Sequence, residues 1–105
     1  MTRVCFLAHE GRLCGFHMEG HADVAKAGKD ILCAAISSAA YLVANTLTEV
    51  YRVEAEISVE DGNMFLQVTE KGRETAAPLL EGLKLHLEGL SEQYPKHLTV
   101  QVRER

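Results

Sequence analysis

The spacing of apolar residues constrains the fold of this 105-residue chain most, because it changes along the chain between two periods. Apolar residues at every second position are typical of a strand with one buried face, and turn residues mark where such a strand ends. Alternation of this kind, or a composition rich in strand-forming residues, predicts five strands. They cover residues 2–8, 12–19, 53–59, 64–68 and 98–102.

Two longer segments repeat their apolar residues at every third or fourth position, which predicts helices. The first starts with Asp30 as a predicted N-cap, and the second with Thr75, with Pro78 tolerated in its first turn. Tyr94-Pro95 ends the second helix. The apolar positions are Ala35, Ile36, Ala39, Val43, Leu47 and Val50 in the first helix, and Leu79, Leu80, Leu83, Leu87 and Leu90 in the second.

The order of these elements is ββαββαβ, with His9-Glu10-Gly11 and Asp61-Gly62-Asn63 as hairpin turns. Two helices that each have one apolar face need a surface to cover, and one mostly antiparallel sheet provides it. We therefore expect an α+β fold in which two helices cover this sheet. The length of the chain predicts a single domain over residues 1–105.

Composition argues against several classes of function. The formal charge of −4 leaves no basic patch for nucleic acid. Residues 31–47 are apolar but short and interrupted by polar side chains, which favours a buried helix over a membrane span. His9, His17 and His21 lack the regular ligand spacing of a metal site. We expect neither a metal nor a cofactor.

The chain has three cysteines, Cys5, Cys14 and Cys33, at spacings that suit neither a disulfide framework nor a zinc knuckle. With no signal peptide at the start of the sequence, we expect free thiols in the cytoplasm. Cys5 and Cys14 fall in predicted strands and are expected to be structural.

Cys33 and His21 suit nucleophilic catalysis. With Asp30 as N-cap, Cys33 lies in the first turn of the helix, where the helix dipole lowers the pKa of a thiol and free N–H groups can hold an oxyanion. His21 lies across a predicted loop, and closure of that loop would bring its imidazole to the thiol as a general base.

Four further residues accompany this pair. Asp30 could orient the imidazole or serve only as the N-cap, and Ser37, four residues after Cys33, could face the site or bond to its own helix. Gly20 and Gly28 flank the loop, which we expect to be the most mobile part of the chain.

Other interpretations of Cys33 stay open at this point. A free cysteine at a helix start is usually a small core residue, and the chain would then be a non-catalytic binding module with a structural Cys33. A redox sensor would need a resolving thiol, and neither Cys5 nor Cys14 is spaced to make one obvious.

Two stretches of sequence distinguish among these interpretations. Gly15-Phe16-His17-Met18-Glu19-Gly20-His21-Ala22 is followed by Gly28-Lys29-Asp30-Ile31-Leu32-Cys33-Ala34-Ala35-Ile36-Ser37. Together they resemble the signature of the ribosomal-processing cysteine protease family, often called Prp: a Gly-His pair, a loop, and Gly-x-Asp-hydrophobic-x-Cys-Ala-Ala-x-Ser opening the first helix.

The resemblance implies a function, and it makes a ribosomal protein or an assembly factor the expected partner of the non-catalytic alternative. It implies a homodimeric cysteine endopeptidase that removes a short N-terminal extension from large-subunit ribosomal protein number twenty-seven, cutting after an aromatic residue. The nucleophile of the family falls on Cys33, its base on His21, its aspartate on Asp30 and its serine on Ser37.

Overall fold

A computed structural model describes residues 1–20, 29–60 and 62–105, with only the backbone described for Lys29 and Asp30. Its centre is a five-stranded sheet in the order β3-β4-β2-β1-β5. Neighbouring strands are antiparallel except β1 and β5, which are parallel. The strands are β1 (Thr2–His9), β2 (Arg12–Glu19), β3 (Ala55–Glu60), β4 (Asn63–Val68) and β5 (Leu98–Glu104).

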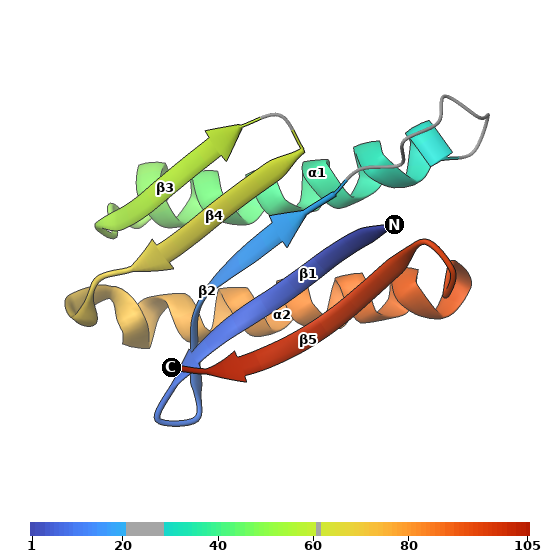
Figure 1. Ribbon diagram of the computed structural model, residues 1–105. Helices are drawn as coiled ribbons and strands as arrows, with labels where there is room; N and C mark the ends of the chain where they lie inside the picture. The colour runs from blue at the N-terminus through green and yellow to red at the C-terminus, as the bar shows by residue number, and fades with distance from the viewer. Residues whose placement is uncertain (21–28, 61) are drawn as a thin grey trace.

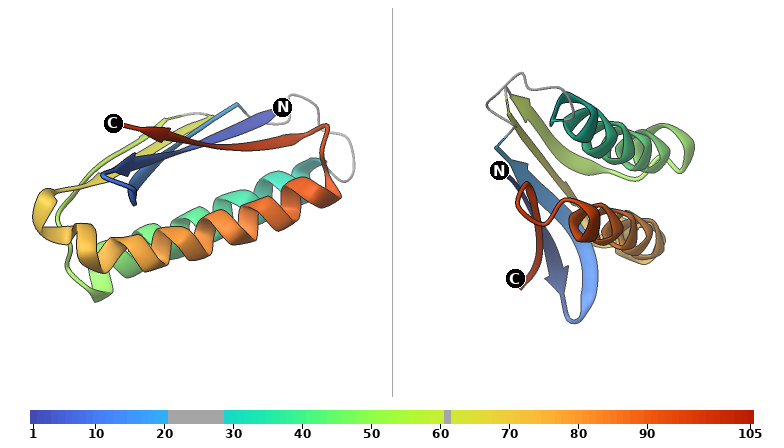
Figure 2. Two further views of the ribbon diagram at one scale, coloured as in Figure 1. Left: turned by 90° about the horizontal axis from the view of Figure 1, so that it is seen from below. Right: turned by 90° about the vertical axis from the view of Figure 1, so that its right-hand side faces the viewer.

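Two helices, α1 (Lys29–Asn45) and α2 (Arg73–Gln93), cover one face of this sheet. In Figure 1, α1 lies behind β3 and β4, whereas α2 lies behind β2, β1 and β5. Figure 2 shows that the other face of the sheet carries no helix. The observed order and layers confirm the predicted α+β fold with a mostly antiparallel sheet.

Glycines occur where the backbone requires them. Glu10 and Gly11, with φ angles of 52° and 79°, connect β1 to β2, and two residues with positive φ are typical of a tight hairpin. Within β2, a Cβ on Gly15 would clash with the backbone of Leu66 and Gln67 in β4. This glycine therefore lets β2 and β4 pair closely.

The core lies between the sheet and the helices. Phe6 and Phe16 face each other on β1 and β2 with ring centroids 6.2 Å apart, and both are fully buried. From α2, Leu80 and Leu87 are fully buried against this layer. Burial of each large side chain contributes about 1.5–3 kcal/mol, so the sheet and α2 form the main stabilising contact.

The structure corrects both predicted helix starts. Helix α1 includes Lys29 and Asp30, so Asp30 is a helical residue rather than the N-cap. Helix α2 begins at Arg73, its N-cap is Gly72, and Thr75 lies inside its first turn. A short 3₁₀ turn, Glu70–Gly72, runs directly into α2. The chain therefore enters α2 through a backbone turn rather than through a side-chain cap.

Helix α1 is less buried than predicted. Among the described residues, one helical segment, Ile31–Val50, is long and apolar enough by length and composition to cross a membrane. It contains α1 from Ile31 onward and the π-helical turn that follows, Thr46–Val50. Here it lies along the sheet and α2, with Ile36 and Leu47 buried. Only 28% of the most apolar part of this segment is buried, and Val50 is 71% exposed. Helix α1 is less covered because it lies behind β3 and β4, at one edge of the sheet.

Strand β3 departs from its predicted burial. Ile57 pairs with Leu66 and Val59 with Met64, so both point to the helix-covered face. They are nevertheless 42% and 50% exposed. The alternating pattern correctly predicted the face to which Ile57 and Val59 point. At this edge of the sheet, however, α1 does not cover that face.

Candidate active site

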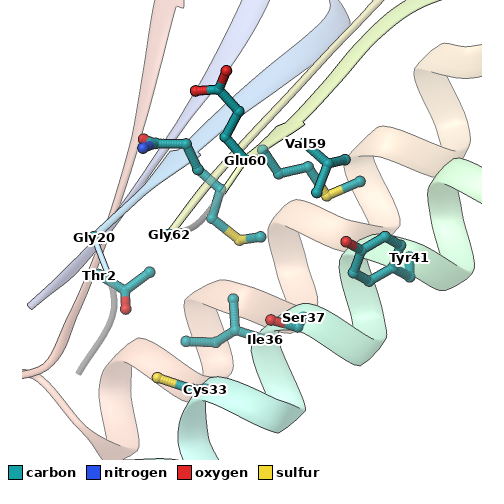
Figure 3. A pocket seen from close by; sticks show the side chains of 12 residues that line it. Thr2, Gly20, Cys33, Ile36, Ser37, Tyr41, Val59, Glu60 and Gly62 are labelled. Atoms are coloured by element: carbon teal, nitrogen blue, oxygen red, sulfur yellow. The ribbon is translucent and has the colours of Figure 1, made fainter. Parts of the chain in front are cut away.

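A cavity of about 220 Å³ lies between the N-terminal half of α1 and the ends of several strands. Figure 3 shows its lining: side chains of α1 on one side, and on the other Thr2, Gly20 and the β3–β4 turn. The cavity is therefore built from parts of the chain that are far apart in sequence.

Helix α1 contributes Cys33, Ser37 and Tyr41 to this cavity. Residues four positions apart lie one above the other on a helix, and Figure 3 shows these three side chains following one another along α1 and projecting toward the strands. Cys33 and Ser37 are half-buried, and Tyr41 is exposed. This helix face thus presents a thiol, a hydroxyl and a phenol to one space.

The strand side is shaped by backbone as well as side chains. Gly20 has a φ angle of 81°, and a Cβ at this position would lie 2.5 Å from the carbonyl oxygen of Met1. Only glycine fits both constraints. The buried Thr2 donates its N–H to the carbonyl oxygen of His97 at 2.9 Å, which fixes the start of β1 at the cavity wall.

The β3–β4 turn completes the cavity with Val59, Glu60, Gly62 and Asn63. Val59 adds an apolar surface, and the exposed Glu60 lies at the rim with its carboxylate directed away from α1 (Figure 3). The described part of the cavity therefore combines an apolar wall with one acidic residue at its rim.

Of the three cysteines, Cys33 alone lines this cavity. Cys14 is 1% exposed, and burial raises the pKa of its thiol. It lies at the start of β2, whereas Gly20 at the cavity follows the end of that strand. Cys5 is half-buried next to His17 on the neighbouring strand, and that pair lies on the uncovered face of the sheet. Their placement gives a redox sensor no resolving thiol in the described part of the cavity.

The structure brings together some of the predicted site residues. Cys33, Ser37 and Gly20 line one cavity. His21 and Gly28 lie outside the described residues, as does the side chain of Asp30. The catalytic pairing of Cys33 with His21 therefore stays a prediction.

The corrected start of α1 changes one part of the predicted chemistry. Cys33 is at least one turn inside α1, not at its third position. The influence of a helix dipole falls off within the first turn, so the helix end acts on the thiol more weakly than predicted. A general base in contact with the thiol thus becomes more important for activating it.

Sequence reasoning missed Tyr41, Val59 and Glu60 as cavity residues. Tyr41 was detectable, because it follows Cys33 by two four-residue steps on the same helix face. Val59 and Glu60 were not detectable from the sequence, because their place at the cavity depends on which strand of the sheet neighbours α1.

The fold and the cavity define a two-layer α+β protein whose open site contains a thiol, an arrangement suited to a cysteine hydrolase. Residues 1–99 match the model of one family, described as cysteine protease Prp. The chain belongs to this family of cysteine proteases, as the motif around Cys33 predicted.

Named relatives and solved structures agree with this assignment. The ribosomal processing cysteine protease Prp of Bacillus subtilis (strain 168) is 27% identical over 99 residues, which cover 89% of this chain and 88% of the relative. A crystal structure of the essential ribosomal processing protease Prp from S. aureus with a substrate peptide has a TM-score of 0.87 at 21% identity. The structure of that protease with a covalently linked product peptide has a TM-score of 0.86 at 22% identity. Both alignments cover 98% of this chain and 100% of the other.

Proposed function

We propose that this chain is an endopeptidase that removes the short N-terminal extension of large-subunit ribosomal protein number twenty-seven, cutting after an aromatic residue. The observation that carries the proposal is the placement of Cys33 in an open cavity of a chain that belongs to the cysteine protease Prp family. The substrate follows from the family resemblance and from the names of the relatives, which describe ribosomal processing.

The proposed reaction uses Cys33 as nucleophile and His21 as base. His21 takes the thiol proton while the sulfur attacks the carbonyl carbon of the scissile bond. The same imidazole then gives that proton to the leaving amine as the C–N bond breaks, which leaves a thioester on Cys33. A water molecule, deprotonated by His21, attacks the thioester and releases the new C-terminus and the free thiol.

Four other residues support these steps in the proposal. Asp30 orients the imidazole of His21, a role left free by the finding that Asp30 is not the helix N-cap. Ser37 lies one helical turn from Cys33 on the cavity wall and contributes a hydroxyl near the reacting carbonyl. Gly20 and Gly28 give the intervening segment the backbone freedom to bring His21 to the thiol.

The cavity chemistry supports an apolar peptide as substrate. Ile36 and Met64 form a buried floor, and Tyr41 and Val59 add apolar surface that is still exposed. An aromatic side chain would bury this surface, and the exposed rim residue Glu60 would favour a positively charged neighbour. The net charge of −4 also suits a basic ribosomal protein better than a nucleic acid.

We also propose that the protein acts in the cytoplasm as a homodimer, without membrane, metal or cofactor. Exposed apolar side chains on the outer side of the helices, such as Leu42 and Leu85 at 68% each, are consistent with a protein contact there. Sedimentation equilibrium distinguishes a monomer from a dimer, because a dimer has twice the mass of the 11.6 kDa chain. A single species at the monomer mass at micromolar concentration would contradict the dimer.

A cleavage assay tests the proposed function. The substrate is a peptide that covers the N-terminal extension and the first mature residues of the ribosomal protein, and mass spectrometry identifies the products. We expect one cut by the wild type and no detectable cut by Cys33→Ala. His21→Ala should lower kcat by about 10²–10⁴-fold, because it removes the general base and acid.

Ser38→Ala serves as the matched control. Ser38 is exposed and neighbours Ser37 on α1, but it lines the groove between α1 and α2 rather than the cavity. This variant should cut at the wild-type rate. Cutting by a folded Cys33→Ala protein would show that Cys33 is not the nucleophile, and no cut by the wild type would exclude this substrate.

A further inference from the structure

Strand β3 forms an edge of the sheet, and one row of its backbone groups pairs with no other strand in the described part of the chain. It pairs with β4 on one side and is the last strand on the other. The N–H of Thr69 donates to the carbonyl of Glu54 at 3.0 Å, directly before β3. Because backbone groups in an antiparallel pair alternate in direction, Ala55, Ile57 and Val59 direct their N–H and C=O groups to the open edge.

The side chains at this edge leave an apolar track. Ile57 and Val59 point to the helix-covered face, yet they are 42% and 50% exposed. Tyr41, on the facing side of α1, is 43% exposed. Val59 and Tyr41 both line the cavity that contains Cys33, so the track along β3 is continuous with that cavity.

Charge is the only usual protection against pairing that this edge carries. Edge strands of soluble proteins commonly have charged residues, proline or a bulge that prevents another strand from adding. The sequence of β3, AEISVE, contains no proline, and its register with β4 is regular. Its charged residues, Glu56 and Glu60, are both acidic.

We propose that the β3 edge is the docking track of the substrate, which binds as an extended, largely apolar peptide with a basic residue and forms a sixth strand beside β3. Alternate side chains of the peptide lie on Ile57 and Val59, and the peptide continues past the end of β3 to Cys33. This inference rests on the proposed endopeptidase function and adds how the peptide is recognised.

Charge decides between a peptide and a second copy of this chain as the occupant. Pairing two β3 edges would bring Glu54, Glu56 and Glu60 of one copy next to the same acidic residues of the other, and like charges on adjacent strands are destabilising. A basic peptide instead complements this row of carboxylates. The edge therefore suits a positively charged peptide better than self-association.

Backbone methylation of the substrate tests the pairing directly. A series of extension peptides, each N-methylated at one amide, is cut by the wild-type enzyme, and kcat/KM is measured for each. Methylation removes a hydrogen-bond donor and adds bulk at the edge, so we expect losses of roughly tenfold or more at alternate amides. The amides between them should tolerate methylation, since they point away from β3.

Variants of β3 test the apolar track from the protein side. Ile57→Ser and Val59→Ser should each raise KM roughly tenfold with little change in kcat, because they remove apolar contact before the chemical step. Ser58→Ala is the control, since Ser58 points to the opposite face of the sheet. The rate of Cys33 alkylation by iodoacetamide should stay at the wild-type value in Ile57→Ser and Ser58→Ala, because neither residue lines the cavity that contains Cys33.

The outcomes separate this inference from the proposed function. If the wild type cuts the peptide but the methylation losses lack a two-residue period, or the serine variants keep the wild-type KM, the track along β3 is wrong and the endopeptidase assignment stands. If the wild type makes no cut, the assigned substrate fails, and the inference fails with it.

Discussion

The two halves of this molecule are packed differently. Under α2, the strands β1, β2 and β5 are closed off by large side chains such as Leu80 and Leu87, which are fully buried. Under α1, the outer strand β3 keeps Ile57 and Val59 exposed, and a cavity opens beside Cys33. The half that stabilises the fold is thus separate from the half that can admit a ligand.

The composition of the two helices accounts for part of this difference. The buried residues of α2 are three leucines and one alanine, whereas those of α1 are Leu32, Ile36 and the small residues Ala40 and Ala44. Small side chains bury less surface and contribute less to stability than leucines do. Helix α1 therefore contributes less apolar surface to the core than α2 does.

The largest expected difference between the halves is in thiol reactivity. Cys33 lines an open cavity, while Cys14 is 1% exposed and burial raises the pKa of its thiol, which lowers its thiolate fraction at neutral pH. We expect iodoacetamide to modify Cys33 at least about a hundredfold faster than Cys14, because the thiolate is the reactive form and Cys14 must be exposed by opening of the fold. Peptide mapping by mass spectrometry over time measures both rates.

Cys33→Ser is the control for this measurement. In this variant the fast phase should disappear and the slow modification of Cys14 should remain. Equal rates at Cys14 and Cys33 in native buffer would contradict the division into a closed and an open half.

The next largest effect is on stability. Leu80→Ala should lower the free energy of unfolding by about 2–5 kcal/mol, because it leaves a cavity in the closed core. Ile57→Ala should lower it by less than about 1 kcal/mol, since its side chain is already 42% exposed. Urea denaturation followed by circular dichroism measures both, and similar losses would show that β3 is covered in solution.

The sequence predicted the order of elements well because periodicity and turn residues are local signals. The hairpin at Glu10-Gly11 and the helix-facing side of β4 are where alternation placed them. Burial at Val50 and Ile57 could not be predicted in the same way. An apolar residue at the correct spacing is buried only if another element covers it, and that depends on the order of strands in the sheet.

The residues of the candidate site also fall into those that local sequence signals could predict and those that depend on the order of strands. Cys33 and Ser37 could be predicted because one helix and one motif contain them both. Val59 and Glu60 join the site only because β4 pairs with β2, which brings the β3–β4 turn to α1. No spacing in the sequence encodes that pairing, so these residues required the structure.

The smallest expected effect tests the start of α2. If Thr75 were the N-cap, Thr75→Ala would cost about 1 kcal/mol of stability. In the structure Thr75 is an exposed helical residue and the N-cap is Gly72. Alanine has the higher helix propensity, so the variant should instead be up to about 0.5 kcal/mol more stable in urea denaturation. A loss near 1 kcal/mol would place the helix start at Thr75 and would mean that a side-chain cap, and not only the buried leucine face, secures the closed half.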